Sequence, residues 1–230
     1  MKDHGPIDPP ATAERIAHSL TEAVHAHRVL PGMKLAEDEV GETFGVGRTV
    51  VRQALRILAG EGLVTLERNR GAFVAKPSAR EAREVFEARA LLEPATARAA
   101  ALRIGADGLA RLNAHIAAEH DALAEGDAGR ALALSGIFHV EIARIAEQGT
   151  IEDFVRQLVS RSSLVIALYW RRRSALCERH AHHALMTAFR AGDGYEASEL
   201  MKGHLVDLLS QLDLRDQEPA PRSLREALGR

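Results

Sequence analysis

The chain has 230 residues with a formal net charge of −2, of which 27% are charged and only 4% aromatic. This length allows two modest domains, and the near-zero net charge excludes a surface that is basic all over. No apolar run approaches the roughly 20 residues of a membrane span, so we expect no membrane partner.

The N-terminal sequence MKDHGPIDPP has no apolar stretch typical of a signal peptide, and we expect residues 1–11 to be disordered. The only cysteine, Cys177, cannot form an internal disulfide. A reducing compartment is therefore expected, which predicts a cytoplasmic protein.

Residues 1–76 combine helical and strand-like patterns. Helices are predicted over residues 12–27, 37–44 and 48–59. Alternating residues over 63–67 and 72–75, separated by the turn Arg68-Asn69-Arg70-Gly71, predict a hairpin. Two helices joined by a short glycine-containing turn and followed by a hairpin are typical of a winged helix-turn-helix domain.

Residues 77–80 form the expected linker, and residues 81–230 the second domain. Their pattern is helical almost without interruption. The predicted helices lie near residues 79–103, 106–124, 127–147, 150–172, 175–191 and 194–215. No strand signal interrupts them, so the predicted fold is mainly α: an N-terminal winged helix-turn-helix and a C-terminal all-α bundle.

The third predicted helix carries two different faces. One face carries an apolar stripe of Val51, Leu55 and Leu58. The other face carries arginines at i+4 spacing. Residues 48–76 hold six Lys or Arg against two Glu, and residues 1–47 hold four against eight Asp or Glu. Arginines bind phosphates or guanine edges and glutamine reads adenine, so this face and the hairpin tip are a candidate DNA interface. The alternative is a solvated arginine face. The candidate contacts are Arg48, Thr49, Arg52, Gln53, Arg56, Arg68 and Arg70.

The DNA-binding domain of the GntR family of bacterial transcription regulators resembles the stretch PGMKLAEDEVGETFGVGRTVVRQALRILAGEGLVTLERNRGAFV. The resemblance implies a homodimer that binds palindromic operator DNA. It places Arg48 and Arg52 at the start of the recognition helix and Gly71 at a wing tip that enters the minor groove. Three positions depart from the family pattern: Gly47 replaces a common Ser or Thr, Val50 a frequent Pro, and Asp38 a DNA-contacting Arg of some members.

The stretch ERHAHHAL contains three neighbouring histidines, which helical phase separates. His182 shares its face with Leu185, Met186 and Phe189, whereas His180 and His183 are expected to point outward. His139 and His204 also lie on apolar faces of their helices. Three inward histidines on three helices of one bundle predict a site for a divalent metal such as Zn, Ni or Mn. Hydrogen-bonded core histidines are the alternative.

The FCD ligand-binding domain, which defines the FadR subfamily, resembles the segments VFEARALLEPATARAAA, SGIFHVEIARIAEQG, HHALMTAFRAGD and LMKGHL. Many members bind a divalent metal through an Asp and three His, and the matching histidines are His139, His182 and His204. The Asp position holds Ser135, one turn before His139. A three-histidine site would leave open positions for water or an effector carboxylate; the alternative is that the metal is not retained.

Arg89 is the second candidate for effector binding, beside Ser135. The resemblance implies a pocket arginine that holds a carboxylate with two hydrogen bonds. The alternative is a surface ion pair with Glu93 four residues later. A small organic acid is the expected effector.

These features predict a transcription regulator, expected to be a repressor, whose operator affinity is controlled by a small acid bound with the help of a metal. A pure metal sensor is one alternative. A metal-dependent hydrolase is another, disfavoured because the motifs HExxH and GxSxG, a phosphate loop and an evident buried general base near the histidines are all missing from the sequence pattern. The chain is therefore expected not to be an enzyme.

Overall fold

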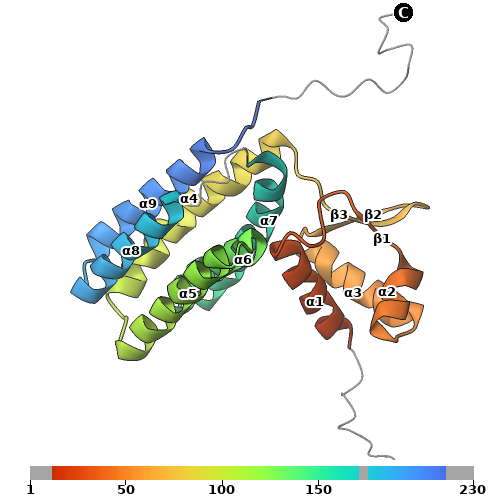
Figure 1. The fold of residues 1–230 in the computed structure, drawn as a ribbon, viewed down its shortest axis with the longest axis horizontal. Helices are drawn as coiled ribbons and strands as arrows, with labels where there is room; N and C mark the ends of the chain where they lie inside the picture. Colours follow the sequence, from red (N-terminus) through yellow and green to blue (C-terminus); the bar gives the residue numbers. More distant parts are fainter. Residues whose placement is uncertain (1–11, 171–175, 216–230) are drawn as a thin grey trace, which may run out of the picture.

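The computed structural model describes residues 12–170 and 176–215, with the side chains of residues 176–180 outside the description. The described residues form a mainly helical fold with one small sheet, as the sequence predicts (Figure 1). No helix in this part of the chain is long and apolar enough to span a membrane. The N-terminal unit contains α1 (Ala13–His25), β1 (Lys34–Leu35), α2 (Glu37–Phe44), α3 (Arg48–Gly60), β2 (Val64–Glu67) and β3 (Gly71–Val74). The second unit contains α4 (Ala79–Ala101), α5 (Ala106–Ala124), α6 (Ala128–Ile145), α7 (Gly149–Tyr169), α8 (Leu176–Ala191) and α9 (Gly194–Ser210).

The N-terminal unit is a helix-turn-helix followed by a hairpin. Gly45 ends α2 in the left-handed conformation (φ 65°), which glycine adopts without steric cost. Gly41 has no room for a side chain, because an added Cβ would lie 2.9 Å from the carbonyl oxygen of Val46. These two glycines let the turn fold back closely on α2 and direct α3 across it.

The three strands form an antiparallel sheet in the order β1-β3-β2, and the β2–β3 hairpin extends away from the helical unit in Figure 1. Glu67 pairs with Gly71 at the hairpin end, where Asn69 (φ 62°) and Gly71 (φ 99°) both have positive φ. The sequence predicted this hairpin but not β1. Buried Ile16, Val51, Leu55, Leu58 and Leu63 belong to the core beneath the sheet.

The second unit is an all-helical bundle. α4 starts at a capping box in which the Ser78 hydroxyl accepts from the backbone N–H of Glu81, and the Glu81 carboxylate accepts from the N–H of Ser78. α4 packs along α9, α5 along α6, and α8 along α9 (Figure 1). Phe86, Phe138 and Phe189 are among the largest fully buried side chains of this bundle.

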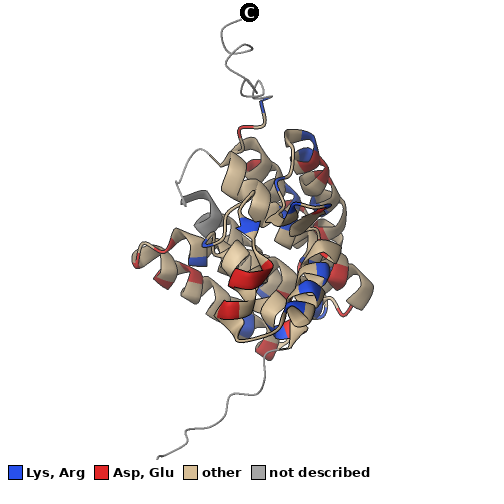
Figure 2. Cartoon of the chain, turned by 90° about the vertical axis from the view of Figure 1, so that its right-hand side faces the viewer, with Lys and Arg blue, Asp and Glu red and all other residues tan. Residues whose placement is uncertain are grey.

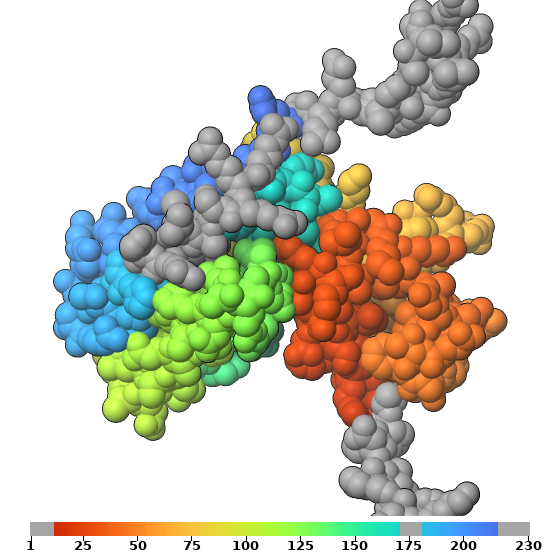
Figure 3. Space-filling model, in the orientation of Figure 1, coloured from red at the N-terminus to blue at the C-terminus, as the bar shows by residue number. Residues whose placement is uncertain are grey.

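The two units are in contact through α1, which lies against α6 and α7. The space-filling view shows the red surface of α1 meeting the green surface of the bundle (Figure 3). Leu164 of α7 is buried in the core of the N-terminal unit, and Nε2 of His27 lies 3.2 Å from the carbonyl oxygen of Ser163. Movement of the bundle helices can therefore reach the N-terminal unit through direct contacts as well as through the connection at residues 75–78.

Candidate nucleic-acid interface and candidate metal centre

The two faces of α3 separate as helical phase predicts. Val51, Leu55 and Leu58 are buried beneath α3. The opposite face is exposed, and so is the hairpin tip. The exposed residues that we predicted to contact DNA are Arg48, Thr49, Arg52, Gln53 and Arg56 on α3 and Arg68, Arg70 and Gly71 at the hairpin. An exposed helix face with arginines at i+4 spacing has the shape and charge that major-groove binding needs.

Acidic residues of α2 neutralise part of this face. Arg48 forms two hydrogen bonds with Asp38, Nε to Oδ1 at 2.7 Å and Nη2 to Oδ2 at 3.1 Å. Nε of Arg52 lies 2.9 Å from both carboxylate oxygens of Glu37. The Arg48–Asp38 pair is about two-thirds exposed on both sides, so water screens it and phosphate oxygens can take the place of the carboxylate.

The hairpin tip shows the same mixture of charges. Arg70 is paired with Glu67 and lies over the ring of Phe73, 5.4 Å from its centre. Figure 2, which views the molecule from the side of the N-terminal unit, shows Lys and Arg interleaved with Asp and Glu. The positive charge that the sequence places on α3 and the hairpin is therefore balanced in part, by ion pairs at Arg48, Arg52 and Arg70.

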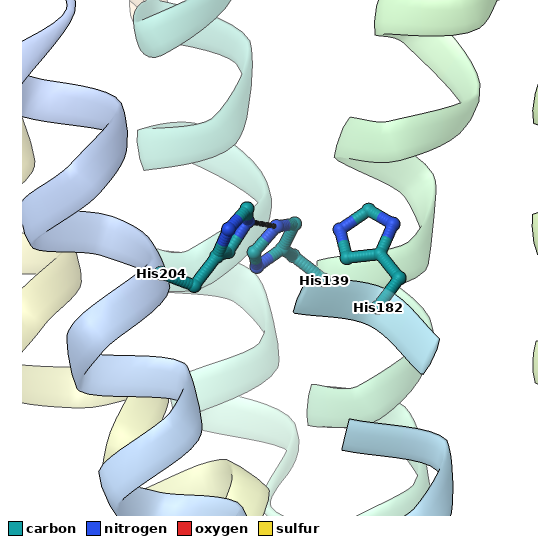
Figure 4. Close-up of side chains that lie close together, drawn as sticks. All are labelled: His139, His182 and His204. Carbon is teal, nitrogen blue, oxygen red and sulfur yellow. Dashed lines mark hydrogen bonds between the residues drawn. The ribbon is translucent and has the colours of Figure 1, made fainter. Parts of the chain in front are cut away.

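The three inward histidines come together inside the bundle. His139 of α6, His182 of α8 and His204 of α9 are all buried, and one ligand nitrogen from each lies within 4.8 Å of the others. Figure 4 shows the rings of His139 and His204 facing each other, with His182 beside them. Nε2 of His139 and Nε2 of His204 are 3.3 Å apart. Nε2 of His182 is buried without a hydrogen-bond partner among the described residues.

This geometry fits a divalent ion. Two imidazole nitrogens that bind one zinc at about 2.1 Å in tetrahedral geometry are about 3.4 Å apart. The separation of His139 and His204 already matches that distance, and the ligand nitrogen of His182 lies within 4.8 Å of both. The unpartnered Nε2 of His182 is the atom that such an ion would satisfy.

Two buried carboxyl groups hold the outer nitrogens of these rings. Oε2 of Glu93 lies 2.6 Å from Nδ1 of His139, and Oε2 of Glu119 lies 3.1 Å from Nδ1 of His182. A carboxylate that accepts from Nδ1–H directs the lone pair of Nε2 toward a metal. Phe138 adds to this by stacking on the His182 ring at 4.3 Å between ring centres.

The lowered pKa values of two of these histidines favour the neutral, metal-binding form of their rings. Burial lowers the pKa of His139 despite the opposing effect of Glu93, and burial together with the neighbouring histidines lowers that of His204 further. Both rings are therefore neutral near pH 7, as metal ligands must be. Burial alone would raise the pKa of Glu93, but Arg89 and His139 outweigh it and lower the pKa to about 2.

Glu93 also corrects the expectation that no buried general base lies near the histidines. Buried carboxyl groups do lie there, as Glu93 and Glu119 show. Because Glu93 is ionised, with its pKa at about 2, and engaged by Arg89 and His139, it is a poor acceptor for a proton near neutral pH.

Arg89 does pair with Glu93, but not at the surface. Its side chain is buried, and it bonds Oε1 of Glu93 at 2.5 Å through Nε and the Ser162 hydroxyl at 3.0 Å through Nη1. Arg89, Ser135 and His139 also line one cavity of about 30 Å³, which has room for one or two water molecules. The surface form of the Arg89–Glu93 pair is therefore wrong. Arg89 lines the cavity, but its Nε and Nη2 already bond Glu93, and its role in effector binding stays a prediction.

The histidine cluster of the sequence divides as expected where it can be followed. His182 is buried and His183 is exposed. His183 lies beside His120, with ring centres 5.3 Å apart. The side chain of His180 lies outside the described residues.

Comparisons with known proteins agree with both units. The family model described as bacterial regulatory proteins, gntR family, matches residues 12–74, and the FCD domain model matches residues 84–207. The chain belongs to the GntR family. The FCD domain match covers most of the second unit and confirms the membership that the sequence indicated.

The relatives of this GntR-family chain are transcription regulators. The Nta operon transcriptional regulator of Aminobacter aminovorans is 28% identical over 79% of this chain and 85% of its own length. The HTH-type transcriptional repressor GlaR of Escherichia coli is 30% identical over 76% of this chain and 84% of its own length. A solved GntR transcriptional regulator from Rhodococcus sp. RHA1 has a TM-score of 0.76 at 26% identity and covers 86% of this chain and 96% of its own.

Sequence reasoning missed Glu93 and Glu119 as partners of the histidines. The signal was present, because Leu112, Ile116 and Glu119 follow the same inward face of α5 at i, i+4 and i+7, and all three are buried. A carboxylate on an apolar face needs a partner. Helical phase, which identified the inward histidines, therefore also identifies Glu119 as an inward residue. It does not show that Glu119 contacts His182.

Proposed function

We propose that this GntR-family chain is an operator-binding transcription regulator, acting as a repressor, whose DNA affinity is controlled by a small organic acid bound in the helical domain with the help of a divalent metal. The observation that carries the DNA-binding part is the exposed arginine face of α3 above a buried apolar face. Arg48, Arg52 and Arg56 would contact phosphates or guanine edges, and Gln53 an adenine edge.

A homodimer would present two such helices to the two halves of a palindromic site, one helical turn of DNA apart. The hairpin would supply the second contact, with Arg68 and Arg70 near phosphates and Gly71 at the minor groove. Because Asp38 and Glu37 pair with Arg48 and Arg52, DNA binding requires an exchange of carboxylate for phosphate partners. We expect this exchange to lower the affinity for DNA below the value that the number of arginines suggests. We also expect it to favour DNA whose phosphates lie where the carboxylates now lie.

The metal would be held by His139, His182 and His204, with Glu93 and Glu119 fixing the orientation of the first two rings. When bound, a divalent ion supplies positive charge that attracts and orients a carboxylate. The chain itself supplies the rest. Ser135, which is neutral, leaves the three histidines without a charged fourth ligand, while Arg89 and Ser135 line the adjoining cavity.

An effector can change DNA affinity only if it binds one conformation of the protein better than another. Typical coupling free energies change the affinity about 5- to 150-fold. The contacts of α1 with α6 and α7 give the bundle a direct route to the DNA-binding unit.

A metal sensor is the second candidate, favoured by the small size of the cavity, which at about 30 Å³ holds little more than water. Titrating zinc against operator binding, with and without organic acids, separates the two. Zinc alone changes the affinity of a metal sensor, whereas the acid is required if the acid is the effector.

The DNA-binding assignment is tested by footprinting Arg52→Ala against the wild-type operator. Specific protection should disappear while the dimer and the thermal midpoint are unchanged, because the Arg52 side chain is exposed and its ion pair is weak. Arg103 is exposed and lies just beyond the end of α4, so Arg103→Ala is the matched control and should protect the operator normally. An unchanged footprint for Arg52→Ala would refute the assignment of α3 as the recognition helix.

A further inference from the structure

The cavity beside the histidine site is lined in part by residues of the N-terminal unit. Arg89, Ser135 and His139 line it from the helical bundle. His25, the last residue of α1, and His27 line it from the N-terminal unit. The cavity therefore belongs to both units, although they are separated in the sequence.

The segment that carries these two histidines is held tightly against the bundle. The carbonyl oxygen of Ala26 approaches α6 so closely that a Cβ added to Gly129 would lie 2.1 Å from it. His27 has a left-handed backbone (φ 52°), which is uncommon outside glycine. Its Nε2 donates to the carbonyl oxygen of Ser163 at 3.2 Å. These contacts fix the end of α1 beside the cavity.

His25 has an unused hydrogen-bonding atom at this place. Its Nε2 is buried and has no hydrogen-bond partner within the described part of the chain. Burial, with smaller effects of His27 and His18, lowers the pKa of His25 to about 4, so the ring is neutral near pH 7. A buried polar atom without a partner is uncommon in folded proteins and is explained by a water or a ligand.

We propose that the effector site is shared by the two domains and that Nε2 of His25 donates a hydrogen bond to the carboxylate of a two- or three-carbon acid seated beside Ser135 and His139. This inference rests on the proposed function, because it names the effector class and one further residue that binds it. At about 30 Å³ the cavity holds one or two water molecules, so even a two-carbon acid must displace this water and widen the cavity, and each added carbon widens it further.

Direct contact at His25 also explains how the ligand would affect DNA binding. α1 packs on α3, the helix that carries the arginine face. An acid bound to His25 touches the first helix of the DNA-binding unit itself, so no relay through the connection at residues 75–78 is needed. Longer acids would have to displace the end of α1 from α6.

Calorimetric titration of the full-length, zinc-supplemented protein with acetate and lactate tests this proposal. His25→Leu, which keeps the volume but removes the hydrogen bond, should weaken acid binding about tenfold. His25→Gln, whose amide nitrogen can take the place of Nε2, should restore most of the affinity. His18→Leu, on an exposed position of the same helix, is the matched control and should bind the acids as wild type does.

Folding and DNA binding are measured on the same samples. His25→Leu should have a thermal midpoint equal to or above wild type, because it removes an unpartnered buried nitrogen. A lower midpoint would contradict that reading of the site. Equal acid affinity in His25→Leu and wild type, or no rescue by His25→Gln, would overturn the role of His25. Wild-type protein that protects its operator but binds neither acid would overturn this inference and leave the operator-binding proposal intact.

Discussion

Replacing Glu119 should weaken metal binding without touching any of the three proposed ligands. Oε2 of Glu119 lies 3.1 Å from Nδ1 of His182, and both side chains are almost fully buried. While this contact holds the proton on Nδ1, Nε2 of His182 presents its lone pair to the ion. Without the contact, the ring can rotate and carry its proton on either nitrogen, so the binding form becomes a fraction of the whole.

General experience with metal-binding histidines gives the expected magnitude. Losing an outer partner of a metal-binding histidine typically costs 10- to 100-fold in metal affinity, about 1.4–2.7 kcal/mol. Glu119→Gln keeps an oxygen that can accept from Nδ1–H and should lie near the tenfold end. Glu119→Leu keeps none and should lie near the 100-fold end. Competition with a fluorescent zinc chelator measures both dissociation constants.

Glu125→Gln is the matched control, since Glu125 caps the same helix but is exposed and pairs only with Arg130 among the described residues. Its zinc affinity should equal that of wild type. If Glu119→Leu binds zinc as tightly as wild type while its thermal midpoint shows a folded protein, the reasoning that links Glu119 to the histidine site is refuted.

Three further predictions concern single residues. Asp38→Asn should strengthen operator binding by about 0.2–1 kcal/mol for each half-site, because it releases Arg48 from an exposed ion pair, and an anisotropy titration showing equal or weaker binding would contradict this. Ser135→Asp should raise zinc affinity about tenfold or more by adding a charged ligand one turn before His139, and equal metal content by elemental analysis would count against the three-histidine site. His25 should make the protein sensitive to acid: its pKa is about 4 in the folded state and 6.5 in the unfolded state, so stability falls as the pH drops from 6.5 toward 4, by about 2 kcal/mol at pH 5. Denaturant unfolding at pH 7 and pH 5 should show a smaller loss in His25→Leu than in wild type.

Much of the fold follows from local sequence signals. α3 begins at Arg48 as predicted, because the turn at Gly45-Val46-Gly47 is a local signal. α5 has the predicted bounds 106–124, because apolar periodicity is also read within a few residues. The helix predicted over 150–172 ends at Tyr169 in the structure. β1 was missed because a two-residue strand is defined only by its pairing with β3, which is a tertiary contact.

The candidate site divides in the same way. Helical phase alone identifies His139, His182 and His204 as inward residues of three helices, and the structure brings them together. Phase does not say which distant side chain meets which, so the partners Glu93 and Glu119 and the buried position of the Arg89–Glu93 pair could not be derived. The contact of His25 with the helical domain and the pairing of Arg48 with Asp38 likewise depend on how whole elements pack.

The central claim is that occupancy of the histidine site and its cavity changes affinity for the operator. It is tested most directly by measuring the operator dissociation constant of the full-length protein with and without zinc and a short carboxylic acid, in wild type and in His139→Ala. We predict a change of about fivefold or more in wild type that is lost in His139→Ala. Operator affinity that is the same under all these conditions in both proteins would contradict the account.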